Sequence, residues 1–113
     1  MSISLNDINF DGPYPITYLD PHYRAAVYTI MCKDDPANKP NEYTLIYVGE
    51  SGDLSERGFY RSHQKYECWI KYAGSVQNLY VGIHLMPDST PEDRSQIKSD
   101  LITHLSPDCN SGN

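Results

Sequence analysis

The sequence predicts a small α+β domain, within the broad α/β class, in which helices flank a central antiparallel three-stranded sheet. Two apolar runs rich in β-forming residues lie at 25–32 and 43–49, and a third lies at 78–86. A dense helix-start signal follows at 89–93. The 113 residues, 39% of them hydrophobic, are enough for one such core and too few for two.

Residues 1–24 are expected to form an extended arm packed on the domain. Pro13, Pro15 and Pro21 disfavour a helix, while Phe10 and the nearby tyrosines supply large apolar contacts. The domain itself is then expected to span residues 25–110.

The runs AAVYTIMC (25–32) and YTLIYVG (43–49) are each as long as one strand, and both are predicted to be central strands. The intervening KDDPANKPNE has two prolines and mixed charge, which is typical of a solvated loop. This loop is long enough to join antiparallel neighbours, so we expect a hairpin.

A helix is predicted over 53–63, because Asp53 and Glu56 have the spacing of a capping box. The segment YECWIKYA is expected to add one or two helical turns that end at Gly74. The third strand, 78–86, is closed by Pro87.

The last helix is predicted from about 90 to 105, with Pro91 in its first turn; Pro107 stops it and 111–113 form a short polar tail. At 100° per residue, Arg94 and Lys98 fall inside the apolar arc of this helix. Arg94 is expected to extend its charge into solvent. For Lys98, at mid-helix, a cleft that accepts its charge is as reasonable as extension into solvent.

The composition bears on the cellular compartment of the protein and on whether it binds a membrane. The three cysteines are odd in number and contain no C-x-x-C pair, so reduced thiols in a cytoplasmic protein are expected. The chain has no apolar run of the ~20 residues that cross a membrane, and its first residues do not resemble a secretory signal. We therefore expect a cytoplasmic protein without membrane association.

Charge is unevenly distributed along the chain. The net charge of −6 opposes general binding to phosphate backbones. Residues 57–71 nevertheless hold four basic side chains and one acidic side chain, so they carry +3 and the rest carries −9. Any contact with DNA or RNA is therefore expected through the four basic residues of this stretch, and such binding should be weak: Arg57, Arg61, Lys65 and Lys71.

One set of residues resembles the GIY-YIG nuclease superfamily. It consists of AVY ending at Tyr28, YVG beginning at Tyr47, the segment Gly49-x-Ser51-x-Asp53-Leu54-x-x-Arg57, and His63. Leu101-Ile102, Pro107 and Asn110 match the C-terminal signature of that family. The resemblance covers roughly residues 25–110 and implies a small GIY-YIG-like domain.

The resemblance also implies roles. Tyr28 and Tyr47 would line the catalytic site, Arg57 would stabilise phosphate charge, and His63 would assist proton transfer. Asn110 would lie at the same cleft.

A departure from the family concerns the metal. The family holds one divalent cation such as Mg²⁺ with a glutamate on the last helix, and that position is Lys98 here. An ammonium group has no lone pair for a metal, so we expect no metal and no other cofactor. Glu50 stands where many members carry a basic residue, so we expect Glu50 to pair with Lys98 across the cleft.

The sequence thus indicates a GIY-YIG nuclease-like domain that has lost metal-dependent cleavage and keeps a cleft for nucleic acid or another ligand. Two alternatives stay open: an active, metal-independent or atypical DNA endonuclease, and a protein-interaction module that uses the acidic remainder. Less favoured are a zinc site from two His-x4-Cys pairs and base stacking by Trp69. The zinc pairs are His63 with Cys68 and His104 with Cys109.

Overall fold

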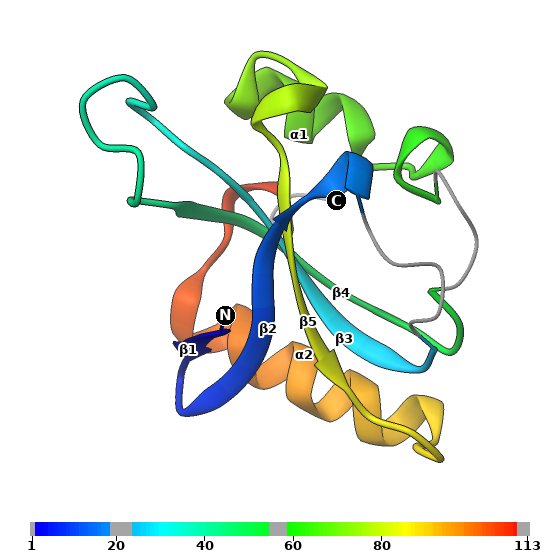
Figure 1. The fold of residues 1–113 in the computed structure, drawn as a ribbon. Coiled ribbons are helices and arrows are strands. Elements are labelled where there is room, and N and C mark those ends of the chain that lie inside the picture. Colours follow the sequence, from blue (N-terminus) through cyan, green and yellow to red (C-terminus); the bar gives the residue numbers. More distant parts are fainter. Residues whose placement is uncertain (1, 19–23, 55–58, 111–113) are drawn as a thin grey trace.

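The computed structural model describes residues 2–18, 24–54 and 59–110 (Figure 1). One five-stranded antiparallel sheet has the order β1-β2-β5-β3-β4. The strands are β1 (Ser2–Leu5), β2 (Ile8–Pro15), β3 (Ala26–Cys32), β4 (Thr44–Ser51) and β5 (Tyr80–Leu85). The α+β class is confirmed, but the prediction of three strands is wrong.

The two additional strands come from the segment that we expected to be an extended arm. Leu5 pairs with Ile8 across the loop residues Asn6 and Asp7, whose φ angles of 51° and 67° suit a tight hairpin. The pairing of β2 with β5 is irregular between Asp11 and Tyr14, where Pro13 lacks a backbone donor. Residues 2–15 therefore belong to the sheet itself.

Strand β3 is the central element of the candidate site. All seven of its residues are buried, and it pairs with β4 on one side and β5 on the other. The predicted hairpin of β3 and β4 is confirmed, whereas the prediction that both are central strands is wrong, because β4 forms an edge. Alternate β3 side chains face two separate apolar clusters.

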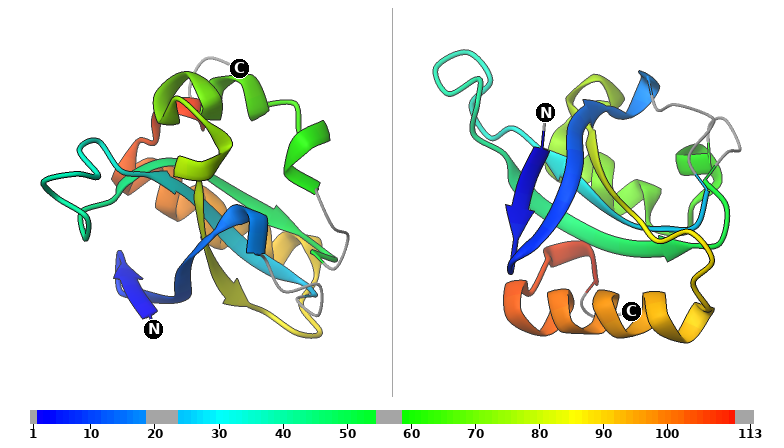
Figure 2. Two further views of the ribbon diagram at one scale, coloured as in Figure 1. Left: turned by 45° about the horizontal axis from the view of Figure 1, so that its top comes forward. Right: turned by 60° about the horizontal axis from the view of Figure 1, so that its bottom comes forward.

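Two helices cover the two faces of this sheet (Figure 2). Helix α1 (Tyr66–Ala73) packs through Trp69 on the face that holds Tyr28, and it ends at Gly74 with φ 87°, as predicted. Helix α2 (Pro91–Leu105) packs through Leu101 on the opposite face. None of the helices in the described residues has the length and hydrophobicity needed to cross a membrane.

The helix starts were predicted with unequal success. Thr90 and Asp93 form a reciprocal capping box at the start of α2, which explains its sharp beginning. Of the helix expected over 53–63, residues 55–58 lie outside the described residues, Glu56 of the expected capping box among them. Residues Phe59–Ser62 form the 3-10 turn η2 in place of α-helix. The other short turns are η1 (Ile16–Tyr18), η3 (Val76–Asn78) and η4 (Asp108–Asn110).

The segment after α2 binds the free edge of β4. The Asn110 side chain accepts a hydrogen bond from the Val48 N–H at 2.7 Å and donates one to the Val48 carbonyl at 2.9 Å. This amide therefore pairs with the strand as a backbone would, which protects the edge. The expected tail, 111–113, lies outside the described residues.

A disulfide joins Cys68 of α1 to Cys109 of η4. The expectation that all thiols are reduced is therefore wrong, and Cys32 is the free, buried cysteine. The disulfide was not predicted from the sequence, because the two cysteines are 41 residues apart and form no local motif. A bond that closes a loop of this size stabilises a domain by about 4 kcal/mol in the chain-entropy model.

The Asn110 clamp predicts an ordered series of stabilities. Asn110→Ala removes both bonds to Val48 and should lower the free energy of unfolding by about 1–2 kcal/mol. Asn110→Asp should cost more, because a carboxylate oxygen then faces the Val48 carbonyl. Urea denaturation of the oxidised protein measures both. Asn38→Ala, on the exposed β3–β4 loop, is the control, and an Asp variant as stable as the wild type would contradict the assignment.

Candidate functional site

Tyr28 and Tyr47 lie on neighbouring strands with their rings on the same face of the sheet, 6.2 Å apart between centroids. Tyr28 is opposite Gly49 in the register of β3 and β4. A Cβ atom on Gly49 would lie only 2.5 Å from Tyr28 Oη and closer still to the ring. Glycine is therefore required at position 49 for the Tyr28 ring to cross β4.

His63 is brought to Tyr28 by the turn that follows η2. Its Nδ1 accepts a hydrogen bond from the Lys65 N–H at 3.0 Å, so in the neutral ring the proton lies on Nε2. Nε2 is 3.1 Å from Tyr28 Oη and therefore donates to it. The backbone of residue 65 thus fixes both the tautomer and the direction of the bond.

Trp69 packs behind these three residues. Its ring centroid is 4.6 Å from that of His63 and 5.3 Å from that of Tyr47. We refer to Tyr28, Tyr47, His63 and Trp69 as the tyrosine–histidine cluster. Because Trp69 is fully buried, it orders the cluster and is not exposed for base stacking.

Both tyrosines are protonated at neutral pH. Burial is the main cause that raises the pKa of Tyr28 far above its ordinary value, with further contributions from Tyr47 and the Glu50 charge. Burial also raises the pKa of Tyr47, which a hydrogen bond with Tyr28 partly offsets. The two hydroxyls therefore influence each other inside the cluster.

His63 is neutral at neutral pH. Burial lowers the pKa of its imidazole, and the positive charges of Lys98 and then Lys65 lower it further. Hydrogen bonds therefore link the Lys65 N–H, His63, Tyr28 and Tyr47 in one chain. Both nitrogens of His63 are occupied, and the hydroxyl of Tyr47 lies at the end of the chain.

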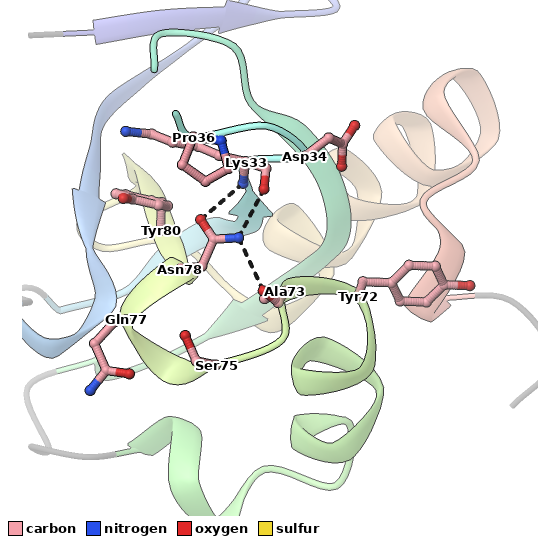
Figure 3. A pocket seen from close by; sticks show the side chains of 9 residues that line it. All are labelled: Lys33, Asp34, Pro36, Tyr72, Ala73, Ser75, Gln77, Asn78 and Tyr80. Carbon is pink, nitrogen blue, oxygen red and sulfur yellow. Dashed lines mark hydrogen bonds between the residues drawn. The ribbon is translucent and has the colours of Figure 1, made fainter. Parts of the chain in front are cut away.

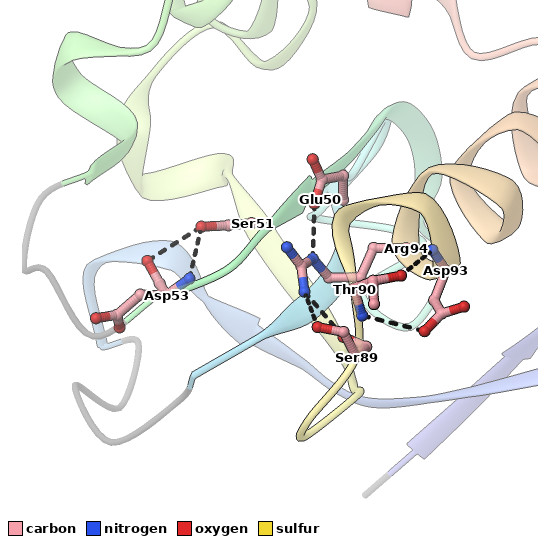
Figure 4. A network of polar contacts seen from close by, with 7 residues as sticks. All are labelled: Glu50, Ser51, Asp53, Ser89, Thr90, Asp93 and Arg94. Atoms are coloured by element: carbon pink, nitrogen blue, oxygen red, sulfur yellow. Dashed lines mark hydrogen bonds and ion pairs between the residues drawn. The ribbon is translucent and has the colours of Figure 1, made fainter.

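The partner of Glu50 is Arg94 (Figure 4). Arg94 Nε donates to Glu50 Oε2 at 2.8 Å, and Nη1 donates to the Ser89 carbonyl and hydroxyl, both at 2.9 Å. The expected Glu50–Lys98 pair is therefore wrong, as is the expectation that Arg94 extends into solvent, since only 6% of it is exposed. Arg94 lies one turn before Lys98, and its guanidinium occupies the Glu50 carboxylate in place of the Lys98 ammonium.

Lys98 is half-buried on α2, and its ammonium group forms neither an ion pair nor a hydrogen bond with the described residues. Its charge nevertheless acts on His63, although α2 packs on the other face of the sheet.

The other predicted site residues do not all lie at the cluster. Arg57 lies outside the described residues. Arg61 is exposed on η2 with its guanidinium over the Tyr60 ring, Lys65 is half-buried before α1, and Lys71 is exposed in its last turn. Asn110 is engaged by the backbone of β4 and so has a structural role.

No group of three or more metal-ligating side chains is found in the described parts of the chain. The alternative zinc site required Cys68 and Cys109 as separate thiolates. These two sulfurs are bonded to each other, which contradicts that alternative.

A cavity of about 490 Å³ lies away from the predicted site residues (Figure 3). It is lined by residues of the β3–β4 loop, the end of α1, η3 with Asn78, and the start of β5. The Asn78 side chain is fully committed to the Lys33 backbone and the Ala73 carbonyl. The Lys33 ammonium lies 4.9 Å from the centroid of the Tyr80 ring and 5.2 Å from that of Tyr43. These groups are already satisfied, so the tyrosine–histidine cluster is the better candidate.

No protein-family model matches the chain, and no curated protein or solved structure is significantly similar to it. The functional interpretation therefore depends on the geometry of the cluster. Sequence reasoning missed Gly49 as a steric requirement, Arg94 as the partner of Glu50, and the Cys68–Cys109 bond. For the Arg94–Glu50 pair, the available signal was that Arg94 and Lys98 lie on the same arc of the helix, so either could have been the partner of Glu50.

The Tyr28–Gly49 contact predicts the effect of one added methyl group. Gly49→Ala should displace the Tyr28 ring and destabilise the protein by about 1–3 kcal/mol, as overpacking does. Urea unfolding followed by the fluorescence of Trp69, the one tryptophan of the chain, measures this. Gly52→Ala is the matched control, because its Cβ would meet only the end of the Arg94 side chain at 3.3 Å. Equal effects of the two substitutions would contradict the contact.

The influence of Lys98 on His63 predicts a pH effect. Since the folded state disfavours protonation of His63, this group destabilises the protein as pH falls below its unfolded pKa of about 6.5. Lys98→Met should raise the pKa of His63 in the folded protein and reduce this loss of stability. Titration of the His63 ring protons by NMR checks the direction, with His84 as an internal control. An unchanged titration of His63 would show that Lys98 does not act on it.

Proposed function

We propose that this protein is a GIY-YIG nuclease-like domain that binds a phosphodiester at the tyrosine–histidine cluster and does not cleave it by a metal-dependent route. The observation that carries this proposal is the positive charge of Lys98, which acts on His63 at the position where the family resemblance implies a metal-binding glutamate. An ammonium group there favours an anion and repels a metal cation.

The hydrogen-bond chain supports the binding of an acceptor. It ends at the Tyr47 hydroxyl, and both ring nitrogens of His63 are occupied. The cluster therefore has a donor to offer to a phosphoryl oxygen, whereas it has no free basic nitrogen to activate water. With their raised pKa values, Tyr28 and Tyr47 are also poor bases at neutral pH.

The basic segment beside the cluster supports contact with a polyanion. Three basic residues lie close in sequence to His63: Arg61 on η2, Lys65 just before α1 and Lys71 on α1. Because the protein is acidic overall, this attraction is local, salt-sensitive and independent of base sequence. DNA and RNA are therefore both suitable ligands, and neither requires a cofactor.

Binding is tested by fluorescence anisotropy with a labelled single-stranded oligonucleotide at low salt. Lys98→Glu and Lys65→Glu should each weaken binding by about tenfold, because each reverses a charge next to His63. Lys39→Glu is the matched control: it makes the same change in net charge on the exposed β3–β4 loop and should leave affinity unchanged. Equal losses in all three variants would show that only overall charge matters, and no binding by the wild type would favour a protein partner.

Cleavage is tested separately with supercoiled plasmid in Mg²⁺ and in EDTA. The wild type should leave the plasmid intact in both, because position 98 of α2 carries an ammonium group and not a carboxylate. Lys98→Glu should be run in parallel, since it restores the ligand type of the family. Nicking by the wild type in Mg²⁺ that EDTA abolishes would refute the proposal, and nicking that persists in EDTA would support a metal-independent nuclease.

A further inference from the structure

The Cys68–Cys109 disulfide joins the two structural elements that hold the tyrosine–histidine cluster in place. The cysteines are 41 residues apart in sequence, and their Cα atoms are 5.9 Å apart. Cys68 belongs to α1, which covers one face of the sheet, and Cys109 belongs to η4, which follows α2 from the other face. The bond therefore connects the two layers around the free edge of β4.

Each cysteine directly precedes a residue that positions the cluster. Trp69 follows Cys68 and packs on the rings of His63 and Tyr47. Asn110 follows Cys109 and binds the backbone of Val48, which is next to Tyr47 in β4. A change at either sulfur is thus one residue away from a contact that orders Tyr47.

Helix α1 depends on such tertiary anchors. It has only eight residues, and no side chain caps its N-terminus. Helices this short are not stable on their own, so the position of α1 follows from what it is attached to. Loss of the covalent link would leave Trp69 held by packing alone.

We propose that Cys68 and Cys109 form a redox-sensitive site, at which reduction by a dithiol loosens the tyrosine–histidine cluster and oxidation restores it. Its consequence for ligand binding rests on the proposed function, but the structural change does not. Cys68 is half-buried and Cys109 is buried, so the attacking thiolate approaches Cys68.

The exchange balances as an ordinary dithiol–disulfide reaction. A thiolate of the reductant attacks Cys68 Sγ, forming a mixed disulfide and releasing Cys109 as a thiolate that takes up a proton. The second thiol of the reductant then attacks the mixed disulfide, which releases Cys68 and leaves the reductant as a disulfide. Two electrons and two protons pass from the dithiol to the protein.

The test compares the oxidised and the dithiothreitol-reduced wild-type protein. Thiol titration of the denatured chain should count one free thiol before reduction and three after it. Acrylamide quenching of Trp69 should increase by about twofold on reduction, because the ring gains access to solvent when α1 loosens. Far-UV circular dichroism should show that the sheet and α2 persist, and reoxidation should restore the original quenching.

Matched variants separate the disulfide from other effects of the reductant. Cys68→Ser with Cys109→Ser should show the quenching of the reduced protein in either condition. Cys32→Ala, which removes the buried free thiol, should respond to reductant as the wild type does.

Two results would overturn the proposal. One is unchanged quenching in a protein whose three thiols are all titratable; the other is unfolding of the reduced chain, which would make the bond a structural crosslink only. Oligonucleotide binding is measured on the same samples. If the oxidised protein binds no oligonucleotide while quenching still responds to reduction, the proposed function fails and the redox site stands.

Discussion

The approach of the Tyr28 ring to Gly49 is the contact on which the candidate site depends. It requires that β3 and β4 pair in one register, because a shift by one residue would place a side chain under the ring and turn Tyr28 to the other face. With the register fixed, the Tyr28 hydroxyl lies within hydrogen-bonding distance of His63. The rest of the cluster then packs around a position that the backbone has already determined.

Two charges act on this cluster, and they differ in whether an opposite charge is paired with them. Glu50 and Lys98 both influence the buried rings, yet Glu50 is neutralised by Arg94 through a short, nearly buried ion pair. A buried ion pair adds little net stability, but loss of one partner leaves an uncompensated charge. Because Arg94 is paired with Glu50, the α2 charge that lowers the pKa of His63 is that of Lys98. The positive sign of the local charge at the cluster therefore follows from this pairing and not from the net charge of the chain.

The sequence was sufficient for the elements whose signals are local. The β-rich run of β3 and the helix-start signal at 89–93 both identified their elements. The β1–β2 hairpin was missed because the prolines indicated only an extended arm. The alternation of Ile3, Leu5, Ile8 and Phe10 around a two-residue loop was not used. The pairing of Glu50 with Arg94, and the bond between Cys68 and Cys109, are long-range properties that one sequence does not encode locally.

The edge position of β4 explains why so much of this small protein converges there. The composition of β4 predicted a central strand because it is as apolar as one. Its four middle residues are buried, since α2 lies against one face and α1 against the other. An apolar edge strand is a site of aggregation unless its backbone groups are satisfied. Here the Asn110 amide supplies that satisfaction at Val48, and the disulfide holds the preceding residue. Because Tyr47 and Gly49 flank Val48, the device that protects the edge also fixes the tyrosine–histidine cluster, so edge protection and site geometry cannot vary independently.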